Sequence, residues 1–132
     1  MTSESGSTNA AEAWGPPTSG LAVRVRRTAT RASVCEIAGD LDAETRAPVI
    51  SALDGLTAER PSSIVVDLQH VAFCDSSGLN LLLQARMNAV AAGIDFRIAR
   101  PSPAVARVFE LTGTDAVFSI HLDDTAVPRP SG

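Results

Sequence analysis

The sequence predicts a single α/β domain in which helices pack against a mixed sheet of four to five strands. Stretches with the apolar pattern of strands alternate along the chain with stretches that have the spacing of amphipathic helices, in the order β-β-α-β-α-β-α. Residues 64–66, Ile-Val-Val, form a short run of β-branched residues in the middle of this order. Such a run is typical of a buried strand in a layered sheet.

The order begins with two strands joined by a short link. Residues 21–26 alternate apolar and polar side chains, as a half-exposed strand does, and residues 33–38 form a second strand that ends at Gly39. Two strands so close in sequence predict a hairpin at one edge of the sheet.

Pro48 decides where the first helix begins, because proline is tolerated in the first turn of a helix but not in its interior. We therefore expect the helix to start near Thr45, which leaves Asp42 in the preceding loop, free to line a surface. The expected buried face comprises Val49, Ile50, Leu53 and Leu56.

The second half of the order is predicted in the same way. Its elements are a strand at 64–68, a loop at 69–74, a helix at 79–92 closed by Gly93, a strand at 94–99, a helix from Ser102-Pro103 to Gly113, and a short strand or turn at 116–122. The two helices should bury Leu79, Leu82, Leu83, Met87 and Val90, and Val105, Val108, Phe109 and Leu111, respectively.

Composition bounds the domain and the function. Of the 132 residues 45% are hydrophobic, and the formal net charge is −4, which argues against a general nucleic-acid binder. Residues 1–19 and 126–132 are rich in small residues and proline, so we expect tails on either side of a domain at 20–125. Neither an apolar run of roughly 18–20 residues nor a secretion signal is visible, so we expect a cytoplasmic protein outside the membrane.

The two cysteines, Cys35 and Cys74, form neither a CxxC motif nor a metal-ligand cluster. In a cytosolic protein we expect both to be reduced and buried, although Cys74 directly precedes the candidate site. No metal ion or cofactor is predicted.

Asp75-Ser76-Ser77-Gly78 stands where a strand-to-loop passage meets the start of a helix. The free N–H groups and the positive dipole end of a helix suit an anion or a phosphoryl group. The alternative is that Asp75 and a serine simply cap the helix. Because loops after parallel strands gather at one sheet edge, we expect Asp42 to share a surface with this tetrapeptide.

An enzyme is not predicted. The chain has two histidines, His70 and His121, but it has no nucleophile-elbow motif, no P-loop and no dinucleotide-binding glycine pattern. A sensor with a small-molecule pocket has no support in the sequence either.

Four stretches in this order and spacing resemble the STAS domains of anti-sigma factor antagonists, over roughly residues 20–122. They are 37–42 (IAGDLD), 65–68 (VVDL), 73–79 (FCDSSGL), and 100–103 with 108–113 (RPSP and VFELTG). The chain departs from the family at Cys74, where an aliphatic residue or methionine is usual, and in its longer N-terminal tail.

The resemblance implies a regulatory binding protein with Ser76 as phosphoacceptor. In that family, the unphosphorylated form binds an anti-sigma factor that is also a serine kinase and thereby frees a sigma factor, a partner switch used in stress responses. The partner binds the ATP, and a phosphatase reverses the modification. The implied binding residues are Asp42, Asp75, Ser76, Ser77 and Gly78. The alternative is a STAS scaffold or an accessory subunit of a stress-signalling or transporter complex.

Overall fold

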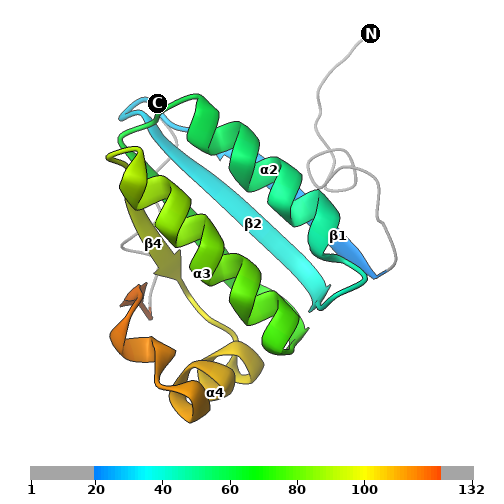
Figure 1. Cartoon of the computed structure of the whole chain (residues 1–132). Helices are drawn as coiled ribbons and strands as arrows, with labels where there is room; N and C mark the ends of the chain where they lie inside the picture. The colour runs from blue at the N-terminus through cyan, green and yellow to red at the C-terminus, as the bar shows by residue number, and fades with distance from the viewer. Residues whose placement is uncertain (1–19, 123–132) are drawn as a thin grey trace, which may run out of the picture.

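A computed structural model describes residues 20–122, which form a five-stranded sheet and three α-helices (Figure 1). The elements are β1 (Leu21–Arg27), β2 (Ala32–Leu41), α2 (Arg46–Ala58), β3 (Ser63–Cys74), α3 (Ser76–Ala91), β4 (Asp95–Ala99), α4 (Pro103–Thr112), the 3₁₀ helix η2 (Thr114–Ala116) and β5 (Ser119–His121). The tails predicted at 1–19 and 126–132 lie outside the described residues, as do residues 123–125.

The strands lie in the sheet in the order β1-β2-β3-β4-β5, which is also their order in the chain. β1 and β2 form an antiparallel hairpin, whereas β2, β3, β4 and β5 run parallel. The predicted α/β class, the mixed sheet and the edge hairpin are therefore confirmed.

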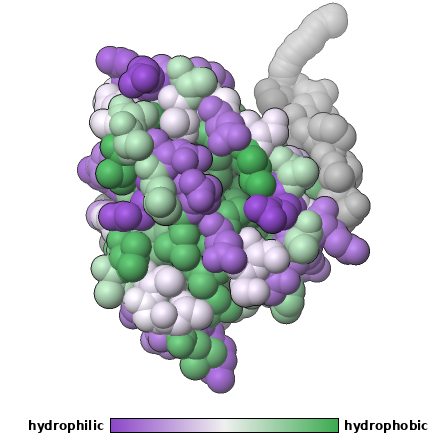
Figure 2. Space-filling view, in the orientation of Figure 1, coloured by the Kyte–Doolittle hydropathy of each residue, from purple (hydrophilic) through white to green (hydrophobic). Residues whose placement is uncertain are grey.

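α2 and α3 lie side by side on one face of the sheet (Figure 1). Between these helices and the strands lies the main core, which includes Ile37, Leu41, Val66, Leu56 and Leu82, each at most 1% exposed. Burial of each such side chain stabilises the fold by about 1.5–3 kcal/mol. Figure 2 shows hydrophilic residues over the outer surface of the helices, with hydrophobic residues visible between them.

Local signals place the starts of α2 and α4 and the end of α4 as expected, whereas α3 begins at Ser76, three residues before the predicted start. Thr45 precedes α2, and Pro48 occupies its third position. Ser102 caps α4 by accepting the Val105 N–H (3.3 Å), with Pro103 as the first helical residue. Gly113 ends α4 in a left-handed conformation (φ +76°), which glycine adopts without strain.

The structure corrects the predicted ends of two strands. β3 continues to Cys74, so residues 69–74 form strand rather than loop, and β2 continues through Gly39 to Leu41. The β2–β3 pairing contains two register shifts, between Glu36 and Ala38 and between Gly39 and Asp40. These irregularities break the period-2 pattern on which the sequence prediction of strands depends.

Three predicted core residues are instead exposed. Met87 and Val90 on α3 are 60% and 54% exposed, and Leu111 on α4 is 73% exposed. At the C-terminal end of α3 the small Ala89 is fully buried, which shows that the helix packs there through alanine rather than through larger side chains. Within residues 20–122, no helix is both long and apolar enough to span a membrane.

Candidate functional site

The site lies where β2 and β3 end together. Leu41 and Cys74, the last residues of the two strands, are partners in the parallel register, and the Asp75 N–H donates to the Leu41 carbonyl (3.3 Å). Asp42 and Asp75, one residue beyond each strand, therefore occupy neighbouring positions at one sheet edge. This is the arrangement that the strand order predicts.

Asp75 is the N-cap of α3, and its Oδ1 accepts the Gly78 N–H (3.1 Å). Ser76 and Ser77 are the first two helical residues; the former is exposed and the latter half-buried. The helix is thus capped by the aspartate, and the exposed Ser76 side chain is accessible at the positive end of the helix dipole.

Asp42 lies in the loop after β2 as expected, but its carboxylate is not free of hydrogen bonds. Its Oδ1 accepts the N–H groups of Glu44 (2.9 Å) and Thr45 (3.1 Å), so the half-buried carboxylate closes the turn before α2. The Thr45 hydroxyl donates to the Asp40 carbonyl (2.8 Å) and accepts the Asp42 N–H (3.0 Å). An Asp whose side chain accepts the N–H groups two and three residues further along commonly makes this turn.

Gly78 brings α3 into close contact with the end of β2. A Cβ atom at this position would lie 2.4 Å from the Leu41 carbonyl oxygen and 3.1 Å from the Cys74 Sγ. The position therefore requires the absence of a side chain, and the close approach fixes the first turn of α3 against the sheet.

Both cysteines are free and buried, as predicted. Burial, and to a lesser degree the negative charge of Asp75, raise the pKa of Cys74 to about 11. Burial and the nearby Glu36 raise the pKa of Cys35 to about 12. The reactive thiolate form is therefore disfavoured at neutral pH in both.

Phe73 is not among the predicted site residues, yet it is 50% exposed at the end of β3 and lies three residues before Ser76. No local sequence signal predicts its exposure, because residues 71–74 are all apolar. In the structure Leu68, Val71 and Cys74 are buried, and each is separated from the next by two exposed residues. A spacing of three between buried residues departs from regular alternation and indicates a bulged strand, in which an apolar side chain can point outward.

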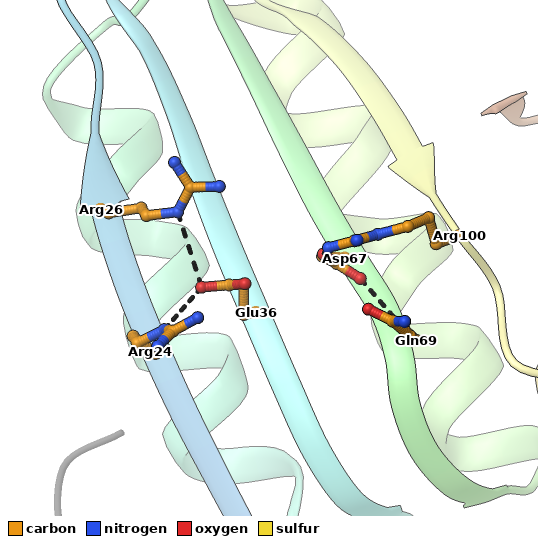
Figure 3. Close-up of polar contacts among 6 residues, drawn as sticks. All are labelled: Arg24, Arg26, Glu36, Asp67, Gln69 and Arg100. Carbon is orange, nitrogen blue, oxygen red and sulfur yellow. Dashed lines mark hydrogen bonds and ion pairs between the residues drawn. The ribbon is translucent and has the colours of Figure 1, made fainter. Parts of the chain in front are cut away.

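A second charged cluster lies on the sheet face opposite the helices (Figure 3). Glu36 accepts from Arg24 Nε (2.6 Å) and lies 3.6 Å from Arg26 Nε. Burial alone would raise the pKa of Glu36, but the Arg24 hydrogen bond and the surrounding arginines outweigh burial and lower it. The positive charges of the arginines balance the negative charge of Glu36, so the cluster is suited to a structural role.

On the same face, Asp67 is almost fully buried and pairs with Arg100 (Figure 3). Its other oxygen accepts the Gln69 N–H (3.0 Å). Within residues 20–122, no group of three or more histidine, cysteine, aspartate or glutamate side chains is placed to hold a metal ion.

Comparison with known proteins gives a consistent result. The family model described as "Mlab, STAS domain" matches residues 25–122. The anti-sigma-F factor antagonist RsfB of Mycobacterium tuberculosis is 28% identical over 88 residues, which cover 67% of this chain and 71% of that protein.

Solved structures share the fold. An anti-sigma factor antagonist from Mycobacterium paratuberculosis gives a TM-score of 0.70 at 27% identity, over 76% of this chain and 85% of its own. The anti-sigma factor antagonist SpoIIAA in its unphosphorylated form gives 0.67 at 20% identity, over 80% and 92%. Its phosphorylated form, described as a Bacillus cell fate determinant, gives 0.62 at 19% identity, over 80% and 96%.

Proposed function

Because the chain belongs to the STAS domain family, we propose that it acts as an anti-sigma factor antagonist. In this proposal, the unphosphorylated chain binds an anti-sigma factor and releases the sigma factor that the latter holds. The names of the Mycobacterium relatives support the assignment. The observation that carries it is the exposed Ser76 at the first position of α3, beside the capping Asp75.

Phosphorylation of Ser76 would act on the binding surface through charge. The phosphoryl group adds nearly two negative charges beside Asp75. Two unit charges about 5 Å apart at an effective dielectric of about 20 repel by roughly 3 kcal/mol before salt screening. If half of this repulsion opposes binding, affinity falls about tenfold.

The position of Ser76 also limits how far its phosphorylation would destabilise the fold. Ser76 lies in the first turn of the 16-residue helix α3, where the dipole and the free N–H groups favour negative charge. The phosphorylated chain would therefore stay folded and lose affinity for its partner. The partner would supply the ATP and the kinase, a phosphatase would remove the phosphoryl group, and this chain would perform no catalysis.

The phosphoacceptor is tested by intact-mass spectrometry after incubation with ATP and each anti-sigma factor kinase of the source organism. We expect one added phosphoryl group on the wild type and on Ser77→Ala, and none on Ser76→Ala. The Ser77→Ala variant is the matched control, because it removes a hydroxyl one residue away. Modification of Ser76→Ala would move the acceptor elsewhere.

The switch is tested by calorimetric titration of the same anti-sigma factor. We expect Ser76→Asp to bind at least about tenfold more weakly than the wild type, because half of the roughly 3 kcal/mol of charge repulsion corresponds to about a tenfold loss of affinity. Equal affinity of Ser76→Asp and the wild type would contradict the charge mechanism.

A further inference from the structure

Phe73 is half-exposed although it lies within a strand of the sheet. Val71, two residues before Phe73, is buried, and in a regular strand residues two apart point to the same face, so Phe73 would also point into the core. The next residue, Cys74, is buried instead. The register shift between Gly39 and Asp40 interrupts that alternation just before Phe73 pairs with Asp40. A bulge thus directs a phenylalanine outward at the edge that carries Ser76.

The two segments that meet at Phe73 are rich in carboxylates. Its register partner Asp40 is exposed, as is Glu44 in the following turn. The two segments that form this edge, 39–45 and 69–78, contain four carboxylates and neither arginine nor lysine.

Exposed aromatic side chains are enriched at the centres of protein interfaces, and polar side chains form the rims of such interfaces. Phe73 lies three positions before Ser76, a span of at most about 11 Å along the chain. One standard interface of about 800 Å² per partner therefore covers both residues.

We propose that Phe73 is an aromatic anchor of the partner interface and inserts into an apolar pocket with a basic rim on the anti-sigma factor. This inference rests on the proposed function and extends its binding surface. The interface then runs from Ser76 around the sheet edge to Phe73 and Asp40. Phosphorylation of Ser76 would weaken binding. Phe73 would contribute affinity through its burial in the partner, and Asp40 would contribute affinity through its charge.

The test is calorimetric titration of the anti-sigma factor that phosphorylates the wild type, using Phe73→Ala, Asp40→Arg and Met87→Ala. We expect Phe73→Ala and Asp40→Arg each to weaken binding at least about tenfold. Met87→Ala, which truncates an exposed apolar side chain about 16 Å along α3 from Ser76, should bind like the wild type. Thermal unfolding monitored by circular dichroism verifies that each variant is folded.

The outcomes separate this inference from the proposed function. If Ser76→Asp loses binding while Phe73→Ala and Asp40→Arg bind like the wild type, the anchor is wrong and the switch stands. If Phe73→Ala loses binding while Ser76→Asp does not, the surface stands and the switch is wrong. Equal losses in Phe73→Ala and Met87→Ala overturn the anchor. Failure of the wild type to bind any anti-sigma factor overturns both.

Discussion

At the scale of single residues, Gly78 sets the distance between the first turn of α3 and the end of β2. The carbonyl that its missing side chain would meet belongs to Leu41, a core residue that cannot move aside freely. If a methyl group is added at Gly78, the backbone of α3 and that of Leu41 must move apart. Because Ser76 is in the same helical turn, it would move with α3.

We expect Gly78→Ala to destabilise the protein by about 1–3 kcal/mol, because overpacking outweighs the gain in helix propensity. Gly55→Ala in α2 is the matched control. No atom lies within 4 Å of the Cβ that this substitution adds, so it should stabilise the protein by about 0.5–1 kcal/mol. Urea unfolding measures both changes. Equal effects of the two substitutions would show that α3 adjusts freely at Gly78.

Sequence spacing identified the residues that gather at this edge, but not what their side chains do. Asp42 was expected to be free, and instead its oxygen accepts two backbone N–H groups, because the chain turns back into α2 immediately after β2. Phe73 was not identified, because its exposure depends on the register between two strands far apart in the chain. Both outcomes are set by tertiary geometry and are not visible in local residue patterns.

At the scale of elements, α3 depends on its cap at Asp75. The carboxylate supplies both the hydrogen bond to the Gly78 N–H and a negative charge beside Ser76. Substitution by asparagine preserves the acceptor and removes the charge, whereas alanine removes both.

We expect Asp75→Ala to lower the free energy of unfolding by about 0.5–2 kcal/mol and Asp75→Asn to change it much less. Chemical denaturation gives both values. Ser102→Ala, which removes the cap of α4, provides a comparison at a second helix with the same kind of bond. If Asp75→Asn is as destabilised as Asp75→Ala, then charge, and not the hydrogen bond, stabilises the start of the helix.

Elements with local end signals were predicted closely, and the long strand was not. The starts of α2 and α4 follow from Pro48 and from Ser102-Pro103, which act within one helical turn. The length of β3 follows from its pairing with β2 across two register shifts, so the local residue pattern does not show that residues 69–74 belong to the strand. The same distinction explains why the exposure of Met87 and Val90 was not predicted, because it depends on how α3 packs against the sheet.

At the scale of the whole molecule, the sheet has two unlike faces. One is covered by helices over an aliphatic core, and the other carries the paired charges of Glu36 and Asp67 around Val34, Val65 and Ala99 (Figure 3). Acid should therefore act on the fold mainly through this second face.

The pKa of Glu36 lies below its ordinary value of 4.5 in the folded protein. Below pH 4.5 the unfolded chain therefore binds more protons at this residue, and stability falls as the pH approaches the folded pKa. We expect Glu36→Gln to be less stable than the wild type at pH 7, with a difference that shrinks on acidification. Urea unfolding at a series of pH values measures this.

Glu59→Gln provides the control, because Glu59 pairs with Arg27 on the exposed surface. Solvent screens such a pair, so its removal should change the acid dependence far less. A constant difference between Glu36→Gln and the wild type from pH 7 to acid would show that the Glu36 charge does not contribute.

The coincidence of strand order and chain order bears on how the protein is made. Each strand from β2 onward pairs with the strand synthesised just before it. A chain leaving the ribosome can therefore extend the sheet at an edge that already exists, and no strand must wait for a later one to be inserted beside it. The surface that carries Ser76 needs only β2, β3 and the first turn of α3, so its parts emerge before β4 does.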